Sequence, residues 1–518
     1  MTGVTTDAVR DLIDRALEVY RDDPAALAVL DACYARVSDP LRVAMVGMVK
    51  AGKSTLLNAI LGEEIAATDA GECTRIVTWY RYGDTPRVVI RRPDGKSKEL
   101  PVVRVKGRLT FDLGDETADD VGRLEVEWPS STLRDITLID TPGVASLSAA
   151  VSERSLGFLL PEGAPSETDA VIYLMRHLHD ADISLLQSLR EGAAGLAGST
   201  NSVVVLSRAD EAGSGRIDAM LSASAIAERF SHDEALAELV SAVVPVAGLL
   251  AQSARSLRQS DFTALAKLAA LDRAQREKLL VSADRFVADA ARPGSKDAAR
   301  AALLERFGPF GIRLACSLIK GGVSDASSLS RELARRSGLD ELLELVAGRF
   351  QARAAFLKAD AALASVERVM KDHPHDGTDE LEASIERLRA TAHELRELTC
   401  LATLRTSPPV VEPALVDEAE RLLGGKGVSE ADRLGLGPDA PASEVEAAAR
   451  AALVTWRGLA ASPAADRATV ALCQAVVRSC EAILVASGHG VEAAPRLVLA
   501  PEPGRRGWQE AGHERRAS

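Results

Sequence analysis

The sequence predicts an α/β domain of the P-loop class, embedded in an α-helical neck and an elongated helical-bundle stalk. Residues 47–54 read GMVKAGKS, which is the G-x-x-x-x-G-K-[ST] phosphate-binding pattern. Short apolar runs typical of buried strands recur up to about residue 246, whereas nearly all of the chain after Ala251 has helical periodicity. These observations separate a nucleotide-binding part from a helical part.

The P-loop pattern stands between a predicted strand and a predicted helix. The run VAMV before it is short and apolar, and STLLNAIL after it has helical periodicity. In such a loop, backbone N–H groups and the helix N-terminus bind the β- and γ-phosphates. We expect Lys53 to neutralise phosphate charge and Ser54 to ligate Mg²⁺. The residues predicted to contact the nucleotide here are Gly47, Val49, Lys50, Ala51, Gly52, Lys53, Ser54 and Thr55.

A second motif follows the predicted strand 136–139. Asp140-Thr141-Pro142-Gly143 is a D-x-x-G step, in which Asp140 holds Mg²⁺ through water and the Gly143 amide faces the γ-phosphate. Thr74 lies in a loop between the two motifs, and we expect its hydroxyl to complete the Mg²⁺ shell. The predicted metal ligands are therefore Ser54, Thr74 and Asp140.

A third motif selects the base. After the strand VVVL comes Ser207-Arg208-Ala209-Asp210, at the position of the guanine-reading [NT]-K-x-D motif. The Asp210 carboxylate can accept hydrogen bonds from guanine N1–H and N2–H₂, which adenine does not offer, so GTP or GDP is the expected nucleotide. Ser207 and Arg208 replace the usual residues, and an arginine stem then covers the base. Val246-Ala247-Gly248 matches the last guanine-contacting loop only loosely, with Ala247 as its candidate.

The order of these motifs, with the phrases GKSTLLNAILG and LIDTPGV, resembles the dynamin superfamily of large GTPases, specifically bacterial dynamin-like proteins. The stretches LLERFGPFGIR and SGLDELLELVAGRFQARAAFLKA are similar to the dynamin-like proteins of the actinobacterial isoniazid-inducible operon. The resemblance covers about residues 5–370. It implies that GTP is hydrolysed to GDP and phosphate, and that dimerisation of the GTPase domains is coupled to stalk movement in membrane remodelling or fission.

The resemblance also bears on catalysis. Val144 follows the D-x-x-G step, so the glutamine that orients water in small GTPases has no counterpart there. In the dynamin family a monovalent cation, held partly by a P-loop serine, supplies positive charge, and the matching position here is Lys50. We expect the Lys50 ammonium to stabilise the transition state as a built-in cation; the alternative is a solvated lysine beside an anion. The predicted catalytic set is Lys50, Lys53, Thr74 and Gly143.

The helical parts surround the GTPase domain on both sides. Apolar stripes from Leu342 to Ala361 and from Leu381 to Thr399 predict two long helices that pack antiparallel. A helical appendage that binds a partner is the alternative to a stalk. The expected order is neck helices in 1–39, a dynamin-type GTPase domain in 40–252, a helical neck and connecting region in 253–345, a helical stalk in 346–487 and a disordered tail in 488–518.

Composition narrows the class of protein. The net charge of −13 argues against nucleic acid as a partner, because Lys and Arg contacts to phosphate dominate such binding. The six cysteines form no C-x-x-C pair and no metal-ligand spacing, which favours a reducing cytoplasm. No stretch reaches 18 apolar residues, so we expect a soluble protein that associates peripherally with the inner face of the plasma membrane.

Two functions remain open from the sequence. The first is a mechanochemical GTPase that moves its stalk on a membrane, and the alternative is a GTP-dependent switch or assembly partner of a second dynamin-like GTPase or membrane complex. Either would act as a homodimer through its GTPase domains or as a hetero-oligomer with a similar GTPase. The turn 404–411 is the candidate for membrane contact through Leu404, Val410 and Val411, unless these side chains cover the end of the stalk core. Residues 307–319 are the second candidate.

Overall fold

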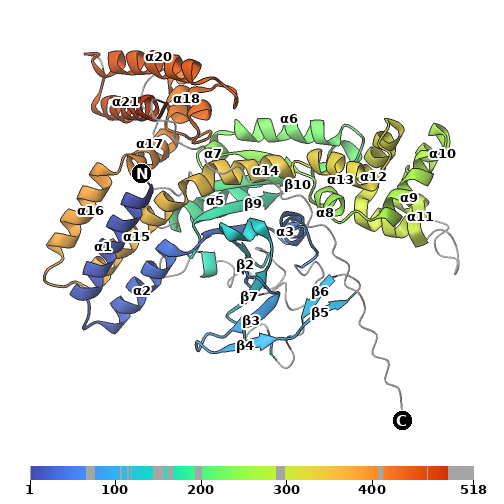
Figure 1. Cartoon of the computed structure of the whole chain (residues 1–518), viewed down its shortest axis with the longest axis horizontal. Helices are drawn as coiled ribbons and strands as arrows, with labels where there is room; N and C mark the ends of the chain where they lie inside the picture. Colours follow the sequence, from blue (N-terminus) through green and yellow to red (C-terminus); the bar gives the residue numbers. More distant parts are fainter. Residues whose placement is uncertain are drawn as a thin grey trace, which may run out of the picture.

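A mixed β-sheet forms the centre of the molecule (Figure 1). The computed structural model describes residues 2–65, 76–105, 108–111, 113, 116–117, 120–143, 157–159, 167–192, 201–287, 298–406, 412–463 and 465–487. Within these ranges the sheet has nine strands, and a separate hairpin has two. The sheet strands are β1 (Leu41–Gly47), β2 (Thr78–Tyr82), β3 (Arg87–Arg91), β4 (Ser97–Leu100), β7 (Arg123–Trp128), β8 (Ile136–Asp140), β9 (Ala170–Met175), β10 (Ser202–Ser207) and β11 (Val243–Val246); the hairpin is β5 (Val102–Val105) with β6 (Arg108–Phe111).

The strand order is β11-β10-β9-β1-β8-β2-β7-β3-β4. Strands β11, β10, β9, β1 and β8 are all parallel, whereas β2 pairs antiparallel to β8 and begins the mixed half. Every residue of β9 and β10 is buried, as their continuous apolar sequences predict for strands covered on both faces. The carboxyl ends of the five parallel strands therefore meet at one edge of the sheet.

Helices cover both faces of the parallel half. Side chains alternate along β1, so Val43 and Met45 join the core that contains α3 (Lys53–Leu61). Ala44 and Val46 point to the other face, where they join the core that contains α5 (Asp180–Gly192), α6 (Ala219–Ser231) and α7 (Glu234–Ala237). Two short 3₁₀ segments, η2 (Ser131–Arg134) and η3 (Ala209–Ser214), connect the layers.

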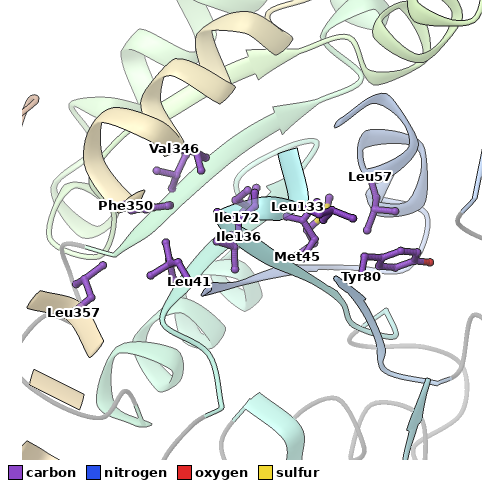
Figure 2. Close-up of a cluster of buried hydrophobic side chains, with 14 of the residues drawn as sticks. Leu41, Met45, Leu57, Tyr80, Leu133, Ile136, Ile172, Val346, Phe350 and Leu357 are labelled. Carbon is purple, nitrogen blue, oxygen red and sulfur yellow. The ribbon is translucent and has the colours of Figure 1, made fainter. Parts of the chain in front are cut away.

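A connector of successive helices also covers the first face of the sheet. It consists of α14 (Leu339–Leu345), the π-helical turn η4 (Val346–Phe350), the 3₁₀ turn η5 (Gln351–Arg353) and α15 (Ala354–Asp372). Figure 2 shows Val346 and Phe350 beside Leu41, Ile136 and Ile172 of the sheet. The sequence predicted one continuous helix here; the structure keeps its path but interrupts it with two turns where it leaves the sheet.

The connector continues into a bundle with the N-terminal helices α1 (Thr2–Val19) and α2 (Pro24–Ser38) and with α16 (Asp379–Thr391). In Figure 1, α1 lies between α15 and α16. Val9, Leu12 and Ile13 of α1 are fully buried, and Arg15 Nη1 donates to Ser384 Oγ of α16 at 3.1 Å. The apolar stripe of α1 thus lies between α15 and α16, which also contact each other directly through the bidentate ion pair of Arg389 with Glu367.

A second bundle follows α16. Its helices are α17 (His393–Thr406), α18 (Pro413–Leu422), α19 (Glu430–Leu434), α20 (Ala442–Ala460) and α21 (Arg467–Ser487), and it has its own core around Trp456, Cys473 and Cys480. Leu404 is 5 % exposed in this core, so its predicted membrane insertion is wrong. Val410, Val411 and the tail 488–518 lie outside the described residues.

Helix α21 is the helix among the described residues that is long and apolar enough to cross a membrane, with a mean hydropathy of 1.6 over Arg467–Ala486. Length and composition alone are weak evidence, because core helices of soluble proteins meet the same criteria. One side of α21 is buried against α20 in the second bundle. That packing accounts for the buried apolar residues of α21, such as Val476 and Ile483, whereas Val485 is exposed.

A helical module lies at the other end of the molecule from the bundles (Figure 1). It consists of α8 (Gly248–Arg255), α9 (Gln259–Ala269), α10 (Arg273–Leu279), α11 (Ala283–Val287), α12 (Ala298–Lys320) and α13 (Ala326–Arg335). Phe307, Phe310, Ile312 and Leu314 of α12 are buried in its core. The second candidate for membrane contact, residues 307–319, therefore belongs to the interior.

The connector gives a stability prediction. Phe350 is fully buried between the connector and the sheet, so Phe350→Ala should leave a cavity and lower the free energy of unfolding by about 3–5 kcal/mol. Urea unfolding followed by fluorescence measures this change. Val454→Ala, at a side chain that is 72 % exposed on α20, is the control and should change stability little. Equal midpoints for the two variants would contradict the packing described.

Candidate nucleotide-binding site

The predicted motifs meet at the carboxyl edge of the parallel strands. The P-loop follows β1, Asp140 ends β8, Ser207 ends β10 and Val246 ends β11. At this edge lies a cavity of about 230 Å³. Its lining residues are Ala51, Gly52, Thr55, Leu56, Leu174, Val205, Ser207, Arg208, Asp210, Glu211, Val246, Gly248 and Leu249. The sheet thus brings together residues about 200 positions apart in the sequence, as the order of parallel strands requires.

Close backbone contacts determine the shape of the P-loop. At Gly47 a Cβ atom would lie 2.4 Å from the carbonyl oxygen of Leu174, so only glycine fits beside β9. At Gly143 a Cβ would lie 2.6 Å from Val49 Cγ2 and 2.8 Å from Val49 Cα. The glycine of the D-x-x-G step therefore packs directly on the P-loop, and any shift of one segment must move the other.

Lys53 begins α3 and is buried at the bottom of the loop. Its ammonium donates to the carbonyl oxygens of Gly47 at 3.0 Å and Met48 at 3.3 Å. Burial lowers the pKa of Lys53, because a charged amine is less stable away from water, while the charge of Asp140 acts in the opposite direction. A desolvated cation in a loop of this shape is suited to a phosphate group.

Asp140 and Ser54 form the polar floor of the site. Ser54 Oγ donates to Asp140 Oδ2 at 3.4 Å, whereas the buried Asp140 Oδ1 has no hydrogen-bond partner among the described residues. Burial raises the pKa of Asp140 to about 6. A carboxylate oxygen and a hydroxyl at this spacing fit a hard, oxygen-seeking cation such as Mg²⁺. The third predicted ligand, Thr74, lies outside the described residues.

The other end of the cavity carries the predicted base-reading residues. Asp210 lies at the start of η3, and burial raises its pKa. Ser207 Oγ donates to the carbonyl oxygen of Met175 at 3.0 Å, which fixes the end of β10 to β9. Arg208 has a left-handed backbone (φ 52°) and donates through Nη2 to the carbonyl oxygen of Lys50 at 3.2 Å. The arginine therefore links the base-reading loop to the P-loop.

Arg208 belongs to a chain of charges at the mouth of the cavity. Its Nη1 donates to Glu211 Oε1 at 3.0 Å, and Glu211 Oε2 accepts from Arg176 Nη2 at 2.6 Å. These side chains are 39 %, 48 % and 44 % exposed, so each ion pair contributes little stability and serves mainly to orient Arg208. Sequence reasoning missed Glu211 and Arg176, although each follows a buried strand by a few residues.

Ala247 does not line the cavity. It is fully buried, and its N–H donates to the carbonyl oxygen of Ser337 at 2.8 Å. Its neighbours Val246 and Gly248 do line the cavity, together with Leu249. Gly248 is the first residue of α8, where backbone N–H groups have no acceptor within the helix. The short run VVPV followed by a helical segment could have indicated Gly248 and Leu249.

The other P-loop residues predicted to contact the nucleotide lie either in the lining of the cavity or at its rim. Ala51, Gly52 and Thr55 line the cavity. Lys50 and Val49 are exposed, with Val49 at 46 %, and Lys50 has a left-handed backbone with φ 63°. Because the Lys50 carbonyl is held by Arg208, its side chain starts from a fixed main-chain position at the cavity rim.

Comparison with known proteins agrees with this arrangement. Residues 43–208 match the model of the dynamin family. The isoniazid-induced protein IniC of Mycobacterium tuberculosis (strain ATCC 25618 / H37Rv) is 43% identical over 486 residues, covering 93% of this chain and 98% of IniC. IniA of the same strain is 36% identical over 163 residues, covering 29% of this chain and 25% of IniA. The bacterial dynamin-like protein of Nostoc punctiforme is 32% identical over 146 residues, covering 26% of this chain and 20% of that protein.

The buried carboxylate predicts a pH-dependent stability. The pKa of Asp140 is about 6 in the folded chain against a usual 3.8, so its contribution to stability is fully present below about pH 4 and is lost as pH rises through about 6. Asp140→Asn should therefore stabilise the nucleotide-free protein at pH 7.5 by on the order of 1–3 kcal/mol, and it should weaken Mg²⁺-dependent nucleotide binding. Urea unfolding at pH 5 and pH 7.5 measures the difference. The exposed Asp376→Asn is the control; no gain for Asp140→Asn at pH 7.5 would contradict the burial.

Proposed function

The chain belongs to the dynamin family of GTPases, and on that premise we propose that GTP hydrolysis moves its helical bundles in the remodelling or fission of a membrane. The protein is a GTPase that binds GTP and GDP with Mg²⁺. Bound Mg²⁺ neutralises charge on the β- and γ-phosphates. The proposal concerns how the residues of this chain hold the nucleotide and what the helices do in response.

Each end of the cavity has a proposed role. At the phosphate end, Lys53 neutralises phosphate charge, Ser54 and Asp140 hold Mg²⁺ together with Thr74, and the Gly143 N–H faces the γ-phosphate. Asp140 Oδ1 supports this assignment, because this buried acceptor has no donor in the described part of the chain and a cation would complement it.

At the base end, the Asp210 carboxylate accepts from guanine N1–H and N2–H₂. The stem of Arg208 lies along the base, and its guanidinium keeps the base-reading loop next to Lys50. Because the Ala247 N–H already donates to the Ser337 carbonyl oxygen, the Gly248 N–H, which has no acceptor among the described residues, replaces it as the donor to guanine O6. All polar groups of the guanine edge then have a partner from the chain.

One observation carries the mechanical part of the proposal: the connector starts at the wall of the nucleotide cavity. Ser337, which is fully buried, accepts from the Ala247 N–H between two cavity residues. At Gly338 (φ 78°) a Cβ would lie 2.1 Å from the carbonyl oxygen of Pro245, so the backbone of the connector touches β11 directly. From this point α14 and α15 run into the bundle of α1, α2 and α16 (Figure 1). A shift of the cavity wall on hydrolysis would therefore reach the bundle.

The partners follow from the same proposal. Two GTPase domains, from two copies of this chain or from this chain and a similar GTPase, meet across their nucleotide sites and complete catalysis. The bundles then act on the inner face of the plasma membrane, where the protein binds peripherally from the cytoplasm.

The test measures GTP turnover against protein concentration, with and without vesicles of anionic phospholipid. We expect turnover per molecule to rise with concentration and to rise about tenfold further on vesicles, within the usual range of coupling between two sites. Co-sedimentation should depend on whether GTP or GDP is present, and vesicles should divide or deform on hydrolysis. Lys53→Ala is the control that removes the phosphate contact. Turnover without vesicle binding in any nucleotide state would favour a switch or assembly partner instead.

A separate prediction concerns Lys50 as the built-in cation. If its ammonium stabilises the developing phosphate charge, turnover should be nearly the same in sodium, potassium or choline salts. Lys50→Ser should lower turnover by about 10²–10³-fold and make it depend on potassium. Lys50→Arg, which keeps the positive charge, is the matched control and should retain much more activity. Strong potassium activation of the unmodified protein would count against this role.

A further inference from the structure

The base-reading loop, residues 207–215, contacts helix α12. This helix lies well beyond residues 43–208, which match the dynamin family model. We infer that α12, through Gly308 and Arg313, positions Asp210 and thereby sets the selectivity of the site for guanine. The inference rests on the proposed role of Asp210 in binding the base. It makes Gly308 and Arg313 positioning residues, because neither is proposed to touch the nucleotide.

Arg313 holds the far end of the base-reading loop. Its Nη1 donates to the carbonyl oxygen of Gly215, the residue that ends η3, and its Nη2 donates to the carbonyl oxygen of Leu280 at 2.6 Å. Hydrogen bonds from a guanidinium are stronger than those between neutral groups. The fork therefore joins the loop that starts with Asp210 to the helical module.

Gly308 touches the near end of the same loop. Its backbone (φ 61°, ψ 174°) breaks the helical course of α12, and the next residue is Pro309, which has no N–H to donate. At the break, a Cβ on Gly308 would lie 3.5 Å from Leu249 Cδ2 and 4.0 Å from Asp210 Oδ2. Leu249 and Asp210 both line the cavity, so the bend of α12 backs the base end of the site.

The bend requires glycine because of its backbone conformation, not because a larger side chain would clash. The distances at Gly308 leave room for a methyl group, but the backbone conformation is one that residues with a Cβ adopt only with strain. An alanine there should shift α12 toward a regular helix and move the wall behind Asp210. Two hydrogen bonds to one edge of a base require placement within about 0.5 Å, so a small shift weakens guanine recognition.

Helix α12 is itself fixed firmly enough to act as a brace. Phe307 and Phe310, on either side of the bend, are buried in the core of the helical module. Ser253 Oγ of α8 donates to the carbonyl oxygen of Arg306, two residues before the bend. Burial also raises the pKa of Asp210, because its carboxylate loses contact with water. Guanine selectivity thus depends on packing outside the sheet.

The test compares dissociation constants for GTP, ITP and ATP in the full chain. ITP lacks the 2-amino group of guanine, so the GTP/ITP ratio reports the hydrogen bond between that group and Asp210. The unmodified protein should prefer GTP to ITP by about tenfold or more, the range for a hydrogen bond to a charged group. Gly308→Ala and Arg313→Ala should each lower this ratio at least about fivefold: GTP loses both of its bonds to Asp210, ITP loses only the bond from N1–H, and ATP affinity stays nearly unchanged. KM for GTP should rise while kcat stays constant.

Two matched controls lie in or just after the same helix. Gly322→Ala also places a Cβ on a left-handed residue (φ 110°), but nothing lies within 4 Å of that atom. Lys320→Ala removes an exposed cation that, like Arg313, donates to a backbone carbonyl of the module, at Leu271. Both controls should keep the GTP/ITP ratio of the unmodified protein. Arg313→Lys should restore part of the ratio lost in Arg313→Ala.

The outcomes separate this inference from the proposed function. An unchanged GTP/ITP ratio in Arg313→Ala, which tests the brace even if Gly308→Ala does not fold, would overturn the inference alone. Equal weakening of all three nucleotides would also overturn it, because a general structural defect does not select among bases. Failure of the unmodified protein to distinguish GTP from ITP and ATP would overturn the role of Asp210 and, with it, the guanine-reading part of the proposed function.

Discussion

Two buried charges of opposite sign, Lys53 and Asp140, constrain the rest of the structure. Burial lowers the pKa of Lys53 and raises that of Asp140, so the fold holds both groups in a state that water would not favour. Loop carbonyls contact the ammonium, and Ser54 contacts one carboxylate oxygen, which leaves the other oxygen without a donor among the described residues. On the proposed function, a phosphate and a cation would complete these contacts, so the unfavourable burial of both charges in the free site would become selectivity for the ligand.

Such a site requires a rigid sheet beneath it. The connector helices that pack on this sheet also continue away from it into the first bundle. The connector buries Val346 and Phe350 on the sheet and then becomes a member of the first bundle as α15 (Figure 2). The π-helical turn at η4 lies at the point of departure, where an extra residue per turn changes the direction of the helix. Stability of the GTPase domain and position of the bundle are therefore set by one stretch of chain.

The sequence was most informative where a function is contained in a short segment. The P-loop, the D-x-x-G step and the Ser207–Asp210 motif each follow a strand with a recognisable apolar pattern, so the fold brings them to one edge as expected. Contacts between distant segments were not accessible in this way: the acceptor for the Ala247 N–H is Ser337, and Leu404 is buried by helices that follow it in the chain. Periodicity shows which face of a helix is buried but not which helix covers it.

The two ends of the nucleotide cavity also differ in which elements of the fold form them. The phosphate end is made by the ends of β1 and β8, the P-loop and α3, with Gly143 packed against Val49. Its link to the helical module is α8, where Arg255 Nη1 donates to the carbonyl oxygens of Ala59 and Ile60 of α3 at 2.8 Å and 2.9 Å. The base end is assembled from η3, the start of α8 and the bend of α12, which belong to different layers. A movement of α12 would change the wall around the base directly, whereas it would reach the phosphate end only through α8. On the proposed function, the module is thus placed to affect how guanine is held, whereas the connector is placed to transmit the result of hydrolysis.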